Sequence, residues 1–210
     1  MHSLAYSGLR DPKILVSHPR WVVVDKPSGW LTIPGRSDAS VPILLDWVKT
    51  QFPAVWVVHR LDRETSGVVL FARSAEDHAL ANAWFAQRSV KKTYYCLAQG
   101  IPEAPFFKVQ QPIEGAASTT QVEVVERFQH SFLARVFPRT GRRHQIRIHL
   151  AARGNPILGD ALYGGKTQLE APVLSISRVA LHAGSLELPT GDRFESPWPE
   201  DFMAWLEMLR

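Results

Sequence analysis

Short runs of β-branched and aromatic residues recur along the whole chain and limit it to folds built on a large sheet. Residues of these types are typical of β-strands. We expect strands at residues 21–25, 55–58, 67–72, 93–98, 121–125, 132–137 and 179–188. Helical patterns are fewer and do not alternate regularly with these runs, which disfavours a doubly wound parallel sheet. The sequence therefore predicts an α+β fold with a mixed, largely antiparallel sheet flanked by helices and loops.

Four segments carry helical patterns. Ser74 precedes Asp77 by three residues, as in a capping box, and apolar residues then recur at helical spacing to about Arg88. Further helices are expected over residues 142–153 and, more weakly, over residues 41–51. Near the C-terminus one helical stripe is expected to be buried, formed by Phe202, Trp205, Leu206 and Leu209.

Length and composition narrow the class of protein. A chain of 210 residues supports one large core, and no long linker divides it, so we expect residues 1–210 to form a single domain. The weakly patterned stretch 100–117 is expected to be a surface excursion. Cys96 is the one cysteine, which excludes an internal disulfide and a four-thiolate metal site. With no run of ~18 apolar residues, we expect a cytoplasmic protein that does not enter a membrane, with a monomer as the default.

Positive charge is concentrated in two acid-free stretches, although the net charge is only +4. Residues 127–159 contain seven arginines, and residues 78–102 contain Arg88, Lys91 and Lys92. Arginine makes planar, bidentate contacts with phosphate, so this clustering predicts one basic face that binds a polyanion. The alternative is a solvated face that only keeps the protein soluble.

Two motifs for other kinds of site fail on inspection. GDALYGGKT, residues 159–167, resembles a phosphate-binding P-loop, but Asp160 stands where that loop needs a glycine. His144 and His149 are five residues apart, whereas zinc-binding helices use a spacing of four. Neither a nucleotide cofactor nor a metal is therefore expected.

A charged turn lies between two of the expected strands. It reads HRLDRETSG, residues 59–67, and places Asp62 between Arg60 and Arg63. Flanking arginines favour the ionised carboxylate, which suits Asp62 to act as a nucleophile or a base. The alternative is that Asp62 and Thr65 only cap the turn.

This turn resembles the active-site signature of the RluA family of pseudouridine synthases, and further motifs resemble that family in the same order. They are VVDKPSGWLTIPGR at residues 23–36, KKTYYCLAQG at 91–100, TGRRHQIRIHLAARGNPILGDALYG at 140–164, and a later Leu181-His182-Ala183. The resemblance implies the fold of a single pseudouridine synthase catalytic domain and an RNA substrate. It also implies no cofactor, because converting uridine to pseudouridine involves no redox change.

The resemblance further implies roles for single residues. Asp62 matches the catalytic aspartate, Tyr94 the tyrosine that packs against the uracil ring, and Arg147 the arginine paired with the catalytic carboxylate. Arg60 matches an arginine that contacts RNA near the flipped base, and Ile146 an apolar residue of the same pocket. We expect nearby polar and basic residues to bind RNA as well, namely Lys92, Arg142, Arg143 and His144.

Other features concern the substrate and the alternatives. Structured RNA is the expected partner, either rRNA or tRNA, because a uridine in a stem-loop must be flipped out before it can react. The ending Pro34-Gly35-Arg36 is most similar to the branch of the family that modifies both RNAs, whereas residues 116–120 depart from the family's Lys-x-Ala-x-Thr run. The chain begins close to the catalytic motifs, so no S4-type RNA-binding domain is expected.

Two other interpretations stay open beside an enzyme of this class. One is an RNA-binding or folding module that keeps the scaffold without turnover. The other is a metal-dependent nuclease or phosphatase, which would need clustered carboxylates that the sequence does not offer.

Overall fold

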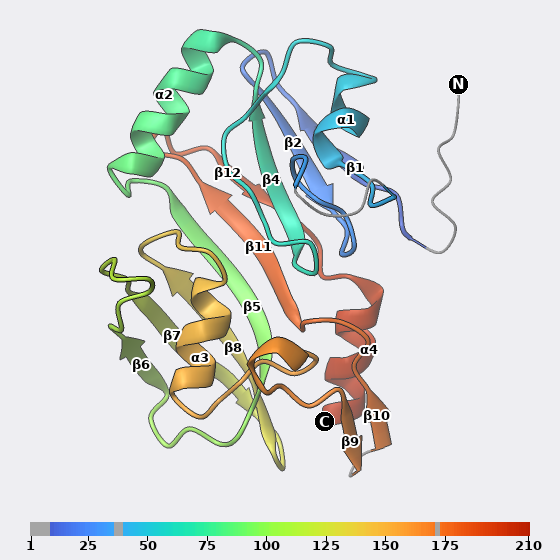
Figure 1. The fold of residues 1–210 in the computed structure, drawn as a ribbon, viewed down its shortest axis with the longest axis vertical. Helices are drawn as coiled ribbons and strands as arrows, with labels where there is room; N and C mark the ends of the chain where they lie inside the picture. Colours follow the sequence, from blue (N-terminus) through green and yellow to red (C-terminus); the bar gives the residue numbers. More distant parts are fainter. Residues whose placement is uncertain (1–8, 36–39, 171–172) are drawn as a thin grey trace.

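The computed structural model of the chain describes residues 9–35, 40–170 and 173–210 (Figure 1). Its strands are β1 (Lys13–Ser17), β2 (Trp21–Lys26), β3 (Trp56–Val57), β4 (Ser66–Ala72), β5 (Lys91–Gln99), β6 (Phe106–Val109), β7 (Thr120–Arg127), β8 (Ser131–Pro138), β9 (Gln168–Glu170), β10 (Val173–Ser175), β11 (Leu181–Glu187) and β12 (Arg193–Glu195). Its helices are α1 (Leu44–Lys49), α2 (Ala75–Ala86), α3 (Gln145–Ala152) and α4 (Glu200–Leu209), and a 3₁₀ turn, η1 (Ala161–Tyr163), follows α3.

Most strands join one large sheet, and β9 and β10 pair separately as a hairpin. The main path of the sheet runs β1-β2-β4-β11-β5-β8-β7-β6, while β3 pairs with β4 and β12 pairs with β11. Among the described strands every pairing is antiparallel except the one between β4 and β11. The predicted α+β class with a mixed, largely antiparallel sheet is confirmed.

The parallel pairing of β4 with β11 depends on a glycine at the start of β4. Gly67 has a φ of +122°, and a Cβ there would lie 2.2 Å from the carbonyl oxygen of Ala183 in β11. A larger residue would suffer both the backbone strain and the clash. Because Gly67 ends the charged turn of residues 59–67, this contact fixes one end of the turn at the centre of the sheet.

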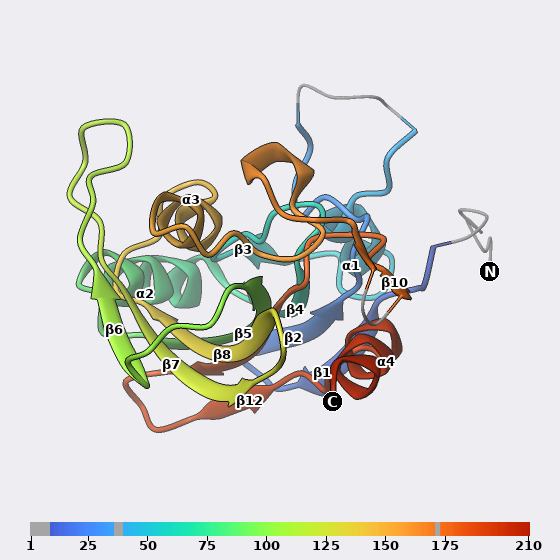
Figure 2. The same ribbon diagram turned by 90° about the horizontal axis from the view of Figure 1, so that it is seen from below.

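Both faces of the sheet carry helices. Figure 2 shows α1, α2 and α3 on one side and α4 on the other. Successive side chains of a strand point to opposite faces. On β5, Tyr94 lies on the α3 side with Ile146. The next residue, Tyr95, packs edge-on against Trp198, which lies just before α4. Residues of β5 therefore serve two different surfaces.

The N-terminal cap of α2 and the buried face of α4 are as predicted, whereas α1 and α3 are shorter than predicted. At the start of α2 the N–H of Asp77 donates to Oγ of Ser74 over 3.0 Å, as the capping box predicts. α3 begins three residues later than predicted because His144 adopts a left-handed conformation with φ of 53°. α1 is shorter than the predicted segment 41–51. The predicted stripe of α4 is buried, namely Phe202, Trp205, Leu206 and Leu209.

Two segments differ from the predicted pattern. The expected surface excursion at residues 100–117 contains an edge strand, β6, which pairs with β7. The strand expected over residues 55–58 is reduced to β3, because the turn that follows makes its hydrogen bonds with residues outside the sheet. In the described ranges no helix is long and apolar enough to cross a membrane.

Candidate active site

A cleft of about 380 Å³ opens on the α3 side of the sheet. Ligand pockets typically measure about 300–1,000 Å³, so it can receive a molecule the size of a nucleoside. Its walls come from the turn after β3, the first residues of β5, the turn after β8 and the first turn of α3. All nine site residues expected from the sequence line it, namely Arg60, Asp62, Lys92, Tyr94, Arg142, Arg143, His144, Ile146 and Arg147.

The turn that carries Asp62 is held by the segment that follows β2. Oγ1 of Thr32 donates to the carbonyl oxygen of Leu61 and accepts from its N–H, each over 3.1 Å. The N–H of Gly29 donates to the carbonyl oxygen of Arg63 over 2.8 Å. These contacts join the 23–36 and 59–67 motifs in space. Arg36, the last residue of the first motif, lies outside the described residues.

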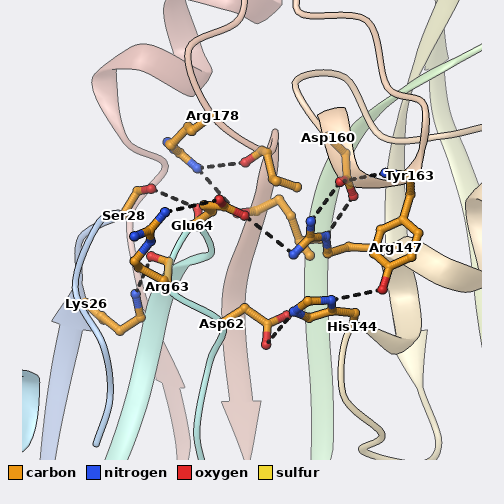
Figure 3. Close-up of polar contacts among 12 residues, drawn as sticks. Lys26, Ser28, Asp62, Arg63, Glu64, His144, Arg147, Asp160, Tyr163 and Arg178 are labelled. Atoms are coloured by element: carbon orange, nitrogen blue, oxygen red, sulfur yellow. Dashed lines mark hydrogen bonds and ion pairs between the residues drawn. The ribbon is translucent and has the colours of Figure 1, made fainter. Parts of the chain in front are cut away.

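Lys26 is the most deeply buried part of this support. Its Nζ donates to the carbonyl oxygens of Pro27 and Trp30 over 3.0 and 2.8 Å. It also donates to the carbonyl oxygen of Arg63 over 3.1 Å (Figure 3). Burial, together with the positive charge of Arg178, lowers the pKa of Lys26 to about 7. Three carbonyl acceptors match the three donors of an ammonium group, so Lys26 ties two loops together when it is protonated.

Asp62 faces His144 across the cleft. Oδ1 of Asp62 lies 3.7 Å from Nε2 of His144, and Nδ1 of His144 lies 3.0 Å from the hydroxyl of Tyr163 in η1 (Figure 3). Burial lowers the pKa of His144, against the opposing attraction of Asp62. A neutral imidazole that accepts from the Tyr163 hydroxyl presents its Nε2–H to Asp62. Histidine is among the few residues that tolerate the left-handed backbone found here.

Arg147 does not make the direct ion pair with Asp62 that the sequence predicted. Its Nε and Nη2 donate to the two carboxylate oxygens of Asp160, each over 2.7 Å, and Nη1 lies 3.5 Å from Oε2 of Glu64. The physical reason is burial: the side chain of Asp160 has no exposed surface, whereas that of Asp62 is 22% exposed and keeps part of its hydration. Arg147 still lines the cleft beside Asp62, and its guanidinium lies 5.2 Å from the ring centre of Tyr163.

Tyr94, Ile146 and Lys92 form the floor of the cleft. Burial and the charge of Asp62 raise the pKa of Tyr94, so its hydroxyl stays neutral. Ile146 is buried and offers an apolar surface. Nζ of Lys92 donates to the carbonyl oxygen of Thr140 over 3.2 Å, and burial lowers its pKa to about 8. An aromatic ring and an aliphatic side chain beside a carboxylate suit a flat, partly polar ligand.

Three arginines at the mouth are placed differently. Arg60, Arg142 and Arg143 are exposed, and in the described part of the chain their side chains make no hydrogen bond or ion pair. Such free guanidinium groups around an opening attract anionic ligands.

The sequence did not predict the residues that hold the cleft-lining side chains in place. Gln145 is buried, accepts from Oγ1 of Thr140 over 2.5 Å and from the N–H of Arg142 over 3.1 Å, and so shapes the turn before α3. Asp160 and Glu64 are not predicted as site residues by the sequence, although both contact Arg147. All three residues lie inside the 59–67 and 140–164 motifs, and this position is the signal that points to them.

The histidines have contacts of other kinds. Nε2 of His59 accepts from the N–H of Leu70, and the ring stacks on Phe85. His149 bonds Oγ1 of Thr120 and the carbonyl oxygen of Gln111. Within the described ranges no three His, Cys, Asp or Glu side chains gather in a way that could hold a metal ion.

Comparison with known proteins agrees with this geometry. A family model described as RNA pseudouridylate synthase matches residues 20–152. The dual-specificity RNA pseudouridine synthase RluA of Vibrio cholerae is 33% identical over 86% of this chain and 79% of that protein. The ribosomal large subunit pseudouridine synthase D of Nitrosomonas europaea is 32% identical over 94% of this chain, which spans 65% of that relative's length.

A solved structure shows the same fold. The human RNA pseudouridylate synthase domain containing 4 superposes with a TM-score of 0.78 at 24% identity, covering 93% of this chain and 92% of that one. The fold, the family model and the relatives point the same way, and the chain belongs to the RluA family of RNA pseudouridine synthases.

Proposed function

We propose that the chain isomerises specific uridines in structured RNA to pseudouridine, with Asp62 as the catalytic carboxylate. One observation carries the proposal: the nine residues that the sequence predicts for the site, from three separate motifs, line a single cleft. The names of the relatives, which mention the ribosomal large subunit and a dual RNA specificity, support an RNA substrate that includes rRNA. The sequence resemblance adds tRNA as the second substrate that we propose. We also propose that the protein acts as a monomer in the cytoplasm, where those RNAs are found.

The reaction balances without a cofactor. The bond from uracil N1 to the ribose breaks, the base turns, a bond from C5 to the same ribose carbon forms, and the C5 proton is exchanged for one at N1. Asp62 starts it by attack on the ribose or the base, or by removal of a ribose proton. An ionised carboxylate is needed in each case.

The remaining cleft residues divide into three tasks. Tyr94 and Ile146 hold the flipped base by stacking and apolar contact, which offsets an unstacking cost of a few kcal/mol. Arg147, fixed by Asp160, supplies positive charge beside the reacting carboxylate without bonding to it. His144 orients Asp62 through its Nε2–H, and the Tyr163 hydroxyl fixes the tautomer that makes this possible.

The arginines at the mouth bind the phosphates of the RNA. Arg60 also enters the space that the flipped base leaves, and Arg142 and Arg143 contact the backbone. Binding of this kind releases counterions, so affinity falls steeply as salt rises.

The test is release of tritium from RNA labelled at uridine C5, with rRNA and tRNA that lack the modification. We expect release at substoichiometric enzyme, with pseudouridine formed in equal amount. Release that survives chelation excludes the metal-dependent alternative. Tight binding of these RNAs without any release would overturn the proposal in favour of an RNA-binding module.

A further inference from the structure

A second groove, of about 420 Å³, lies on the opposite face of the sheet from the active cleft. Thr93 and Tyr95 of β5 line it, whereas Tyr94 between them lines the active cleft. Six basic side chains line the groove, namely Arg88, Lys91, Lys92, Arg135, Arg139 and Arg193, and Glu187 is the one acidic residue among its lining residues. We call it the back groove.

The fold brings the two acid-free stretches of the sequence together here. Arg88, Lys91 and Lys92 come from residues 78–102, and Arg135 and Arg139 come from residues 127–159. They meet because β5 pairs antiparallel with β8, which places Tyr95 opposite Arg135. The active cleft uses Lys92 of the first stretch and Arg142, Arg143 and Arg147 of the second. It leaves the remaining cations, Arg88, Lys91, Arg135 and Arg139, without a task.

Local pairing does not neutralise the back groove. Lys91 bonds Glu187 over 2.6 Å, Arg135 lies 3.5 Å from Glu123, and Arg193 lies 2.6 Å from Glu195. Six cations against these three carboxylates leave three uncompensated positive charges. An accumulation of this kind costs free energy through mutual repulsion and favours an anionic ligand.

Arg135 adds a second sign of a missing partner. Its Nε is the buried side-chain nitrogen that has no hydrogen-bond acceptor in the described part of the protein. Buried donors are almost always satisfied, so the present position of this side chain leaves it short of one acceptor. The Arg135 side chain as a whole is 42% exposed, so a phosphate in the groove can reach its guanidinium group and bind it with parallel hydrogen bonds.

The back groove is continuous with the active cleft. Lys92 and Pro138 line both, at the end of the sheet where β5 begins and β8 ends. A polyanion leaving the cleft past Lys92 therefore enters the back groove without crossing an acidic surface. Of the anionic partners that could bind there, an RNA strand is the one whose neighbouring segment would occupy the cleft under the proposed function.

We propose that the back groove binds the phosphate backbone of the RNA segment flanking the target uridine, so that the substrate bends around the end of the sheet. The inference rests on the proposed function and names a part of the substrate that the cleft itself does not hold. It predicts that RNA length, beyond the stem-loop that fills the cleft, contributes to affinity through Arg88, Arg139 and their neighbours.

The test compares two RNAs and two double variants. The RNAs are a minimal stem-loop containing the target uridine and the same stem-loop with flanking strands long enough to pass Lys92. Arg88→Gln with Arg139→Gln removes two exposed cations from the back groove. Lys13→Gln with Lys49→Gln removes the same charge from exposed positions on β1 and α1, far along the sheet, and serves as the control.

For the groove variant we expect KM for the long RNA to rise about ten-fold, with the salt dependence of binding weaker by about two phosphate contacts. KM for the minimal stem-loop and kcat for both RNAs should equal those of the control variant. Equal losses with both RNAs, or none with the long one, would overturn the proposal. Turnover of the minimal stem-loop by the wild type separates that failure from failure of the proposed function, because its absence would reject the enzyme itself.

Discussion

Replacing Asp160 with Asn removes the negative charge that holds Arg147. The pair is buried on both sides, with 4% of the Arg147 side chain and none of the Asp160 side chain exposed. Removing one partner of such a pair costs about 3–5 kcal/mol, because the remaining charge is left uncompensated. Asn keeps one acceptor and nearly the same shape, and Glu64 stays 3.5 Å away, so we expect about 3 kcal/mol.

Asp201→Asn is the matched control for this change. Asp201 also makes two bonds to an arginine, Arg178, over 2.7 and 2.8 Å, but its side chain is 38% exposed. A partly exposed pair contributes about 1 kcal/mol or less. Urea unfolding followed by far-UV circular dichroism measures both variants, and for a chain of this size about 3 kcal/mol corresponds to a loss of about 6–12 °C in Tm.

A double replacement tests the electrostatic cause. Arg147→Met with Asp160→Leu removes both charges, so most of the lost stability should return. Turnover should be lost in this double variant, because the positive charge beside Asp62 is gone. The reasoning would be refuted if Asp160→Asn were no more destabilising than Asp201→Asn, or if the double replacement were less stable than Asp160→Asn.

Three further predictions concern other parts of the structure. Burial lowers the pKa of His182 to about 4. The neutral, buried imidazole therefore stabilises the fold fully above pH 6.5, and about 3 kcal/mol of unfolding free energy is lost as the pH falls toward 4. Unfolding free energies measured from pH 7 to 4 should show this loss, and a flat profile would contradict it. Gly67→Ala forces a Cβ to within 2.2 Å of the carbonyl oxygen of Ala183 and should cost more than about 3 kcal/mol, with loss of turnover; a variant with wild-type Tm would refute the close approach. Tyr163→Phe removes the hydroxyl that bonds Nδ1 of His144. We expect kcat to fall about ten-fold with KM unchanged, and the acidic limb of the pH dependence of kcat to shift. A change in KM alone would assign Tyr163 to binding instead.

The fold class could be predicted because it depends on residue type along short segments. The runs 67–72, 93–98 and 132–137 became β4, β5 and β8, and the capping box at Ser74 began α2. Boundaries at the site were less predictable. The start of α3 is set by the left-handed His144 and by the side chain of Gln145, and both result from contacts with distant segments.

The candidate site could be predicted as a set of residues but not as a set of bonds. Motifs from three segments predict nine residues, and all nine line one cleft. Which carboxylate Arg147 bonds depends on how deeply each is buried, and a sequence does not state depth. Asp160, with no exposed surface, therefore holds the arginine that the sequence assigned to Asp62.

The most direct test of the central claim compares the wild type with Asp62→Asn on one RNA, measuring tritium release from uridine C5 and binding affinity side by side. Asn preserves the size of the side chain and its place opposite His144, and it removes only the charge that the reaction needs. The account predicts that Asp62→Asn releases no tritium and binds the RNA within a few-fold of the wild type. Substantial release by Asp62→Asn would show that the reaction does not depend on this carboxylate and would contradict the account.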